Sequence, residues 1–375
     1  MQRPFNFSSG PAILPQPVFE RAAEAIRGLR RGGHAPDGEP VGLSILELSH
    51  RGAPYTEVHE GALALCHEVL EIPPDTHQIL LLPGGASQQF AMVPINLGLS
   101  ATPAYFVDTG TWSVKAHKEA SKVTDARILA SSADTDYDRI PTFDPAEAAD
   151  GAYLHITTNN TIYGTEYAEI PDVGEVPLVS DMSSHVGSRP MDWSRLALGY
   201  AGAQKNLGAS GVTLVAIRHE LLERGPVTAI PNFFRYATHA AKNSTFNTPN
   251  TFGVLVLKLV LEWLRDEGGV KAMGTRNEAK AARLYAALDD SSLFAPKARP
   301  GHRSNMNVTF TMTGAPAADR EAMTDRFLRE AEGAGLSGLK GHRSVGGFRA
   351  SIYNAFPDAG VDALIAFLKD FERRQ

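Results

Sequence analysis

The apolar residues of this chain are spaced in two ways, and the change between them predicts its architecture. Residues 17–30 and 54–72 carry apolar side chains at helical spacing. Beyond residue 77 the apolar residues come in short unbroken runs that end in polar side chains, among them QILLL, AYFVD, PLVSD and LGYAG. Runs without alternation are typical of strands buried on both faces. This part is therefore predicted to be an α/β domain with a mostly parallel sheet.

A third pattern begins near residue 252 and predicts a smaller α+β domain. Two long amphipathic helices come first, followed by two strands that alternate with two more helices. The segments expected are 252–269, 270–290, 306–312, 319–335, 346–355 and 361–374. A chain of 375 residues is longer than one hydrophobic core usually serves. We therefore expect a large domain at 16–255 and a small domain made of 1–15 and 256–375.

Composition narrows the classes of function. The chain is 43% hydrophobic and 21% charged, which is ordinary for a globular protein. Its net charge of −6 gives no basic surface for a nucleic acid. The one cysteine, Cys66, excludes an internal disulfide and leaves a cysteine-based zinc site short of ligands. Because no apolar stretch is long enough to span a membrane, we expect a cytoplasmic protein whose Cys66 is a core residue.

Lys205 stands out because it is isolated from other charges. It lies in AGAQKNLGAS, with no charged residue among the nine before it or the twelve after it. A lysine in a surface loop is one interpretation. The other is a lysine removed from water, which loses its proton more easily and becomes a nucleophile for carbonyl groups.

Four further features follow predicted strands in a fixed order. They are the glycine turn PGGAS at 83–87, Trp112, Thr161 and Asp181. A glycine turn that opens a helix can hold a phosphate, an aromatic residue can stack on a ring, and a carboxylate can pair with a protonated pyridine nitrogen. Each alone could be an ordinary turn or core residue. Together with Lys205 they predict a pyridoxal 5′-phosphate (PLP) enzyme.

Arginine and histidine pairs predict an anionic substrate. His50 and Arg51 lie in LSHRG, and His342 and Arg343 lie in GHRSVGGFRAS together with Arg349. Arginine binds carboxylates and phosphates with two parallel hydrogen bonds. These cations suit a substrate with two anionic groups, although ordinary surface charge remains an alternative for each pair.

Six segments carry a resemblance to a known family. They are FNFSSGPAILP, ELSHRG, AGAQKN, FNTPNTF, KGHRSVGGFRASIYNA and the terminal FERR. Nearly end to end, the chain resembles the phosphoserine aminotransferases, which are fold-type I PLP enzymes. The resemblance implies a large domain with a mostly parallel seven-stranded sheet flanked by helices. It also implies transfer of an amino group from L-glutamate to 3-phosphohydroxypyruvate.

The resemblance also implies a role for each candidate residue. Lys205 would form the Schiff base with the cofactor and move the substrate's proton, while Asp181, Trp112 and Thr161 would hold the cofactor ring. The cofactor phosphate would be held by Ala86, Ser87 and Gln204, and by Asn247 and Thr248 from the partner subunit of a homodimer with shared active sites. The substrate would be held by Ser9 and Arg349 at its α-carboxylate and by His50, Arg51, His342 and Arg343 at its distal anion.

Two departures and several alternatives stay open at this stage. Ser87 stands where some family members carry arginine, and the loop at 31–42 is longer than expected. A related aminotransferase acting on alanine or serine with glyoxylate would share the cofactor site. A cysteine desulfurase would need a reactive cysteine on a mobile loop, and an inactive PLP-binding protein would lack the Schiff base. Use of the phosphorylated hydroxythreonine substrate of vitamin B6 synthesis is a further hypothesis.

Overall fold

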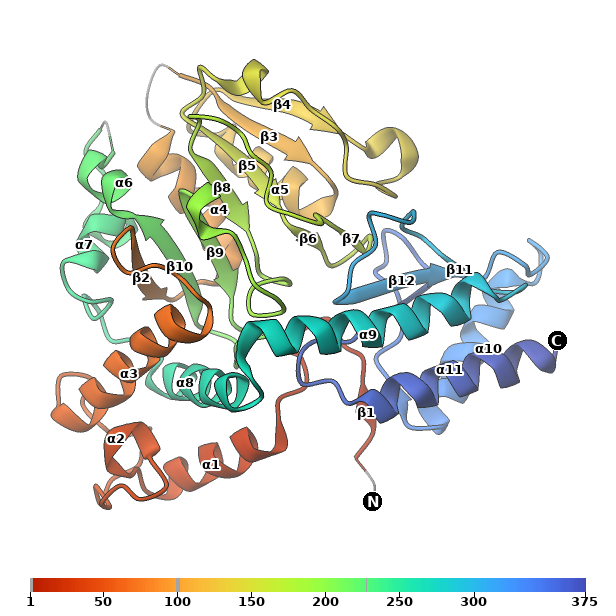
Figure 1. Ribbon diagram of the computed structural model, residues 1–375, viewed down its shortest axis with the longest axis horizontal. Coiled ribbons are helices and arrows are strands. Elements are labelled where there is room, and N and C mark those ends of the chain that lie inside the picture. The colour runs from red at the N-terminus through yellow and green to blue at the C-terminus, as the bar shows by residue number, and fades with distance from the viewer. Residues whose placement is uncertain (1–2, 99–101, 227) are drawn as a thin grey trace.

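The computed structural model describes residues 3–98, 102–226 and 228–375 and has a seven-stranded sheet at its centre (Figure 1). The strand order is β2-β10-β9-β8-β5-β3-β4. Only β10 runs antiparallel to its neighbours. The strands are β2 (His77–Leu82), β3 (Ala104–Asp108), β4 (Ala126–Ser131), β5 (Tyr153–Thr157), β8 (Leu178–Asp181), β9 (Leu198–Gly202) and β10 (Thr213–Arg218). The predicted mostly parallel sheet of seven strands is confirmed.

Helices cover both faces of this sheet because its strands are apolar on both sides. The helices around this sheet and before α9 are α1 (Gln16–Arg27), α2 (Arg31–His34), α3 (Ala53–Val69), α4 (Gly85–Leu97), α5 (Thr111–Ala120), α6 (His219–Arg224), α7 (Tyr236–Ala240) and α8 (Thr251–Asp266). On one face, Leu81 and Leu214 join a core with α3 and α8. On the other face, Leu80 and Val215 join a core with α4 and α5. Successive strand residues thus point to opposite cores.

A second unit packs beside the first around its own apolar core. It contains the three-stranded sheet β11-β12-β14 and the pair β1-β13, in which the N-terminal strand returns to the C-terminal part. Its elements are β1 (Phe5–Asn6), α9 (Gly269–Asp289), β11 (Ala295–Pro296), β12 (Asn307–Thr311), α10 (Arg320–Gly333), β13 (Leu336–Ser337), β14 (Phe348–Ser351) and α11 (Asp358–Arg373). Helix α9 runs from the end of α8 to the small sheet and so bridges the two units (Figure 1).

The remaining elements are short. They are the hairpin of β6 (Asn159–Asn160) and β7 (Thr165–Glu166), and the single 3₁₀ turns η1 (Ala133–Thr135), η2 (Pro145–Ala148), η3 (Trp193–Arg195) and η4 (Asn232–Phe234). The division of the chain at residues 15 and 255 stays a prediction. Because residues 254–261 and Leu264 of α8 pack into the core beneath the large sheet, except for Lys258, we propose that the large unit extends through α8.

The predicted loop at 31–42 contains a short helix and is anchored to the large unit. Gly33 has a positive φ of 66° and lies against the buried side chain of Lys258, where any Cβ would collide. The carbonyl of His34 accepts a hydrogen bond from Arg21. Glycine at position 33 therefore lets this loop close over α8 on its way to His50 and Arg51.

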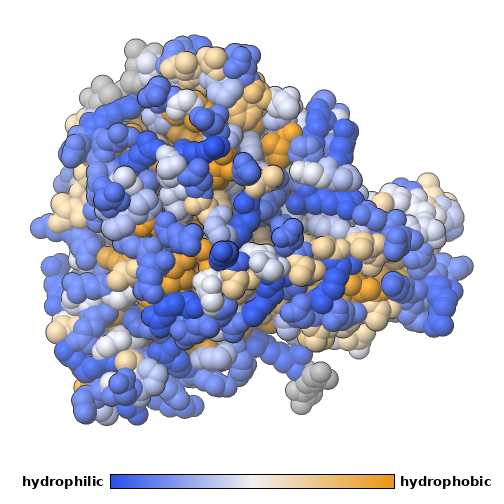
Figure 2. All heavy atoms as spheres, in the orientation of Figure 1, coloured by the Kyte–Doolittle hydropathy of each residue, from blue (hydrophilic) through white to orange (hydrophobic). Residues whose placement is uncertain are grey.

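The outer surface is ordinary for a water-exposed protein. Figure 2 shows hydrophilic residues spread over one face, with apolar residues in scattered patches between them. Within the described residues, no helix is long and apolar enough to cross a membrane. Cys66 is a fully buried residue of α3, as predicted.

Candidate active site

The candidate residues lie where strands of the large sheet end. Asp181 is the last residue of β8, and Lys205 follows β9 by three residues. Trp112 begins α5 just beyond β3, and Thr161 lies in the hairpin beyond β5. Since β3, β5, β8 and β9 are parallel, their carboxyl ends meet at one edge of the sheet. That edge is where α/β proteins bind ligands.

A chain of hydroxyl groups links Lys205 to the protein interior. Lys205 Nζ donates a 2.7 Å hydrogen bond to Thr161 Oγ1. The Thr161 hydroxyl donates in turn to Ser184 Oγ at 3.0 Å, and Ser184 donates to the carbonyl of Asn159 at 2.9 Å. Because each hydroxyl accepts one hydrogen bond and donates the next, the amine of Lys205 has a fixed acceptor.

Burial and charge set the protonation of Lys205 and Asp181 in opposite ways. Burial lowers the pKa of Lys205 to about 8, an effect that nearby Asp181 opposes and Arg349 reinforces. Burial also raises the pKa of Asp181, which Lys205 and the Ser183 backbone N–H counteract. One Asp181 oxygen accepts from that N–H at 3.0 Å. A lysine with a pKa near 8 is partly neutral at physiological pH and can act as a nucleophile.

Trp112 places an aromatic ring beside Lys205. The Lys205 amine lies 5.9 Å from the centre of the Trp112 ring, and Phe90 packs 6.5 Å away from the same ring. Trp112 Nε1 is buried and has no hydrogen-bond partner among the described residues. An indole N–H in this state can donate a hydrogen bond to an acceptor atom of a bound ligand.

The turn before α4 offers backbone donors. Gly84 and Gly85 have positive φ angles of 90° and 68°, and the helix that they open carries Ala86 and Ser87 in its first turn. The first N–H groups of a helix point outward and favour an anion. Gln204 lies at the other side of this edge, where its carbonyl accepts from Ala12 N at 2.9 Å. That bond brings the N-terminal segment with Ser9 next to Lys205.

Cations from the small unit reach the same edge. Arg349, on β14, donates from Nη1 to the carbonyl of Thr161 at 3.3 Å. Its Nε is buried without a partner in the described chain, and burial lowers its pKa. Burial also lowers the pKa of His342, with further lowering by Arg349, Arg343 and Lys115. His342, Arg343 and Arg349 therefore share one electrostatic environment close to Thr161.

The predicted residues His50, Arg51, Asn247 and Thr248 lie on other segments, and no hydrogen bond or ion pair joins them to Lys205 or Thr161 within the described residues. His50 and Arg51 lie in the segment before α3, and Asn247 and Thr248 lie in the loop before α8. The two segments are joined to each other, because Thr251 Oγ1 donates to the carbonyl of Ile45 at 3.3 Å. The segments that carry these residues are therefore in contact near the start of α8.

The comparisons with known proteins agree with this geometry. The sequence profile of the class-V aminotransferases matches residues 4–364. A phosphoserine aminotransferase of Geobacillus kaustophilus is 48% identical over 376 residues, covering 100% of this chain and 99% of that protein. The chain belongs to the class-V aminotransferases. Within that class it belongs with the phosphoserine aminotransferases, as the resemblance implied.

Solved structures extend the agreement to the fold. The phosphoserine aminotransferase of Bacillus circulans subsp. alkalophilus superposes with a TM-score of 0.92 at 41% identity, covering 100% of this chain and 99% of that one. The PLP-bound enzyme of Trichomonas vaginalis gives 0.89 at 33% identity, covering 98% and 100%. An alanine–glyoxylate aminotransferase of Nostoc gives 0.75 at 16% identity, covering 99% and 96%, and shares the fold.

The residues of this aminotransferase fit its cofactor, PLP. The buried carboxylate of Asp181, the aromatic ring of Trp112 and the partly neutral Lys205 are groups that suit a pyridine ring and an aldehyde. The first turn of α4 supplies the kind of donors that a phosphate requires. Burial raises the pKa of the Cys66 thiol to about 12, so Cys66 is an inert core residue.

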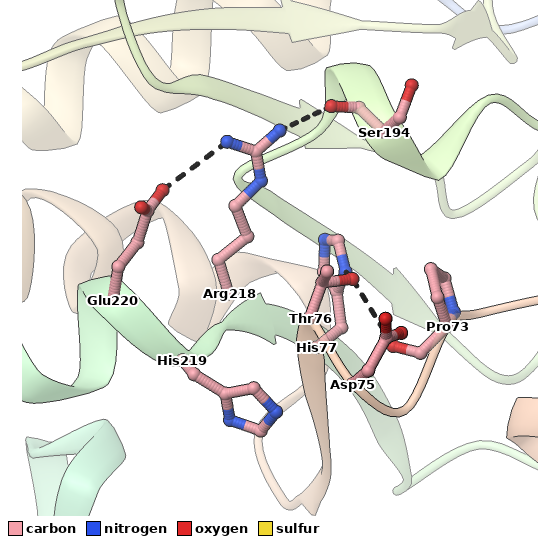
Figure 3. A pocket seen from close by; sticks show the side chains of 8 residues that line it. All are labelled: Pro73, Asp75, Thr76, His77, Ser194, Arg218, His219 and Glu220. Atoms are coloured by element: carbon pink, nitrogen blue, oxygen red, sulfur yellow. Dashed lines mark hydrogen bonds and ion pairs between the residues drawn. The ribbon is translucent and has the colours of Figure 1, made fainter.

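A pocket elsewhere on the aminotransferase can be set apart from this site. Its lining includes His77, at the start of β2, and Arg218, at the end of β10 (Figure 3). Both positions lie at the amino-terminal edge of the parallel strands, opposite Lys205. Arg218 pairs with Glu220 at 3.3 Å, and His77 bonds the carbonyl of Leu196 at 3.0 Å. Arg218 and His77 therefore already have partners within the protein.

Sequence reasoning missed two contributors to the site. Ser184 accepts the hydroxyl of Thr161, and Lys115 lies 4.5 Å over the Trp112 ring. The spacing of Lys115, one helical turn after Trp112, could have indicated it, because residues three apart on a helix are neighbours. Ser184, three residues beyond Asp181 in a run of small polar residues, has no comparable signature.

Proposed function

We propose that this aminotransferase transfers the amino group of L-glutamate to 3-phosphohydroxypyruvate, forming 2-oxoglutarate and O-phospho-L-serine. The observation that carries the proposal is the hydrogen bond from Arg349 to the carbonyl of Thr161, since it brings the cations of the small unit to Lys205. Both amino-group partners carry a carboxylate and a second anionic group, which suits one cationic pocket. The name of the Geobacillus relative, a phosphoserine aminotransferase, supports phosphoserine as a product.

We propose a role for each site residue, guided by the resemblance and by the contacts described above. PLP, when bound, supplies an electron-withdrawing ring that stabilises negative charge at the substrate α-carbon. Asp181 would hold the ring nitrogen protonated, because its carboxylate is buried at the edge where β8 ends. Trp112 would stack on the ring, and the Thr161 hydroxyl, which donates to Ser184 in this structure, would instead donate to the ring hydroxyl. Ala86, Ser87 and Gln204 would hold the cofactor phosphate.

Lys205 would move the proton. Its neutral Nζ would accept the proton from the substrate α-carbon, and the charged amine would then donate that proton to the C4′ carbon of the cofactor. Thr161 already accepts a hydrogen bond from this amine and so orients it. Arg349 and Ser9 would hold the α-carboxylate, while His342 and Arg343 would hold the distal phosphate.

The proposal includes a homodimer with shared active sites. The segments that carry His50, Arg51, Asn247 and Thr248 are in contact, and in a dimer these residues would complete the site of the partner subunit. Exposed apolar residues accompany these two segments: Leu43 is 47% exposed, Leu46 60% and Phe246 37%. Apolar side chains in such positions are favoured at subunit interfaces. We also propose a cytoplasmic location, which the free buried thiol of Cys66 supports.

Absorbance spectroscopy of the purified holoenzyme tests the substrates. L-Glutamate should bleach the visible band of lysine-bound PLP, and 3-phosphohydroxypyruvate should restore it. Recovery with glyoxylate or pyruvate alone would reject the phosphorylated substrate and favour an alanine or serine aminotransferase. The phosphorylated keto acid of vitamin B6 synthesis is the third acceptor to assay, and its failure to restore the band would limit the enzyme to serine synthesis.

A further inference from the structure

A second lysine, Lys280 on α9, is buried more completely than Lys205. Its side chain has no exposed surface. Its amine donates to three backbone carbonyls, those of Ile352 at 3.1 Å, Tyr353 at 2.9 Å and Phe356 at 3.2 Å. All three acceptors lie in the turn that connects β14 to α11. We call this group of carbonyls the 352–356 cage.

The cage has the chemistry of a monovalent-cation site. Three carbonyl oxygens that converge on one charge are what proteins use to replace the hydration shell of K⁺. A protonated amine donates three hydrogen bonds, so each carbonyl has a partner, whereas a neutral amine could donate only two. Among the described residues no ion pair to Lys280 is recorded; the nearby charges are Asp358, Arg276 and Arg283. The carbonyl dipoles therefore favour the protonated amine and oppose burial, which lowers the pKa of Lys280 to about 7.

The cage connects α9 to both sides of the active site. Tyr353 Oη donates to the carbonyl of Ser9 at 2.9 Å. The next residue, Asn354, donates from its backbone to Asn206 Oδ1 at 3.1 Å and from its side chain to the carbonyl of Gly187 at 2.7 Å. Asn206 directly follows Lys205. A shift of the 352–356 turn would therefore displace Ser9 and loosen the segment that carries Lys205.

We propose that Lys280 is a built-in monovalent cation that holds the 352–356 cage together and thereby positions Ser9 and Asn206. Lys280 is a positioning residue, since its amine contacts only backbone carbonyls of this turn in the described structure. Removal of the side chain down to Cβ leaves three unpaired carbonyls around an ammonium-sized space. That space should accept free NH₄⁺ or K⁺. The substrate effect rests on the proposed function, whereas the cation effect does not.

Thermal unfolding of the apoprotein tests the cation site independently of catalysis. Lys280→Ala should lower Tm by at least about 5 °C in choline chloride, because choline is too large for the cage. NH₄Cl or KCl at the same ionic strength should recover at least half of that loss. Lys271→Ala, which removes an exposed lysine from the same helix, is the matched control and should respond to the three salts as the wild type does.

Steady-state kinetics test the positioning role. Lys280→Ala in choline chloride should raise KM for L-glutamate about tenfold or more while kcat falls less, and NH₄⁺ should reverse the change. Tyr353→Phe, which removes the hydroxyl that bonds Ser9, should raise the same KM without any cation response.

Three outcomes would overturn the proposal. One is a Lys280→Ala protein with the same Tm in all three salts, which would reduce Lys280 to a packing residue. The second is an unchanged KM in Tyr353→Phe, which would break the link to Ser9. If Lys280→Ala fails to fold in choline, refolding yields in choline and in NH₄Cl decide the matter, and equal failure in both rejects the cation site. Because Tm is measured without cofactor or substrate, the test of the cation site remains valid even if the proposed substrates are wrong.

Discussion

Two buried lysines of this protein show how the same functional group is used in opposite ways. Lys205 is half-buried, and its amine donates to a single hydroxyl, that of Thr161. Lys280 is fully buried, and its amine donates to three carbonyls. Burial is the largest cause of a lowered pKa in both, to about 8 for Lys205 and about 7 for Lys280.

The number and kind of acceptors separate the two roles. A hydroxyl can accept from a charged amine or donate to a neutral one, so Lys205 can lose its proton without leaving Thr161 unpaired. Carbonyls only accept, so a neutral Lys280 would leave one of them without a donor, at a cost of about 1–3 kcal/mol. Desolvation alone therefore does not identify a catalytic lysine. Its hydrogen-bond partners decide whether the proton can move.

Loss of Lys205 should give the largest effect. Lys205→Ala removes both the covalent attachment of the cofactor and the group that moves the proton, so kcat should fall about 10³-fold or more. The Tm of the apoprotein should change little, because the side chain makes one hydrogen bond to protein. A rate close to that of the wild type would reject Lys205 as the catalytic lysine.

Removal of the charge at Asp181 should give the next largest effect. Asp181→Asn keeps the shape of the side chain but loses the carboxylate, and kcat should fall about 10²–10³-fold. The variant also tests the electrostatic coupling, since the Asp181 charge raises the pKa of Lys205.

The pH dependence of PLP capture by the apoprotein measures the effect of the Asp181 charge on the pKa of Lys205. Only the neutral amine reacts, so the rate of capture by the wild type should rise with pH and level off above about 8. In Asp181→Asn the same rise should occur at lower pH. A rise at the same pH in both proteins would show that Asp181 does not influence Lys205.

How far the sequence could predict these sites depends on how local their causes are. Lys205, Asp181, Trp112 and Thr161 follow strand ends, and parallel strands bring such residues together whatever their separation in the chain. The mostly parallel sheet was predictable from the unbroken apolar runs, whereas its seven strands were implied by the resemblance. Lys280 had no such signature, because the polar residues around it in RNEAKAARLY are typical of a solvent-exposed helix. The burial of Lys280 depends on carbonyls more than 70 residues away.

The loop at 31–42 illustrates a second limit of sequence reasoning. Its glycines and prolines predict a polar loop, and the structure adds the short helix α2 and the contact of Gly33 with Lys258. That contact joins residues more than 200 positions apart. The pairing of His50 with Arg51 was visible in the sequence, but which subunit's site they serve depends on an interface between chains.

Arg343→Ala should have a moderate and selective effect. Arg343 is exposed and lies next to His342, so its loss should weaken the binding of a distal phosphate more than the binding of the distal carboxylate of glutamate. A charged hydrogen bond contributes about 1.5–3 kcal/mol, so KM for 3-phosphohydroxypyruvate should rise roughly 10–100-fold, with a smaller rise for L-glutamate. Lys340→Ala, another exposed cation in the same segment, is the control. Equal effects on both substrates would show that Arg343 does not read the phosphate.

The smallest expected effect is the contribution of the Lys280 proton to the pH dependence of the free energy of unfolding. An unfolded Lys280 would keep its proton up to about pH 10.4, whereas burial lowers its folded pKa to about 7. Between these values the unfolded state binds more protons, so the free energy of unfolding rises with pH, by at most about 1.4 kcal/mol per pH unit. Lys280→Met lacks this contribution. Urea unfolding of both apoproteins from pH 6 to 10 should show the wild type gaining stability relative to the variant. Lys205 is present in both proteins, so its contribution cancels.

The pH at which the gain in stability begins reports on the 352–356 cage. Because the cage favours the protonated amine, this pH measures how strongly the three carbonyls oppose the effect of burial on the pKa. A gain that begins near pH 7 would mean that they oppose it weakly. Parallel curves over the whole range would show that the folded Lys280 keeps its ordinary pKa.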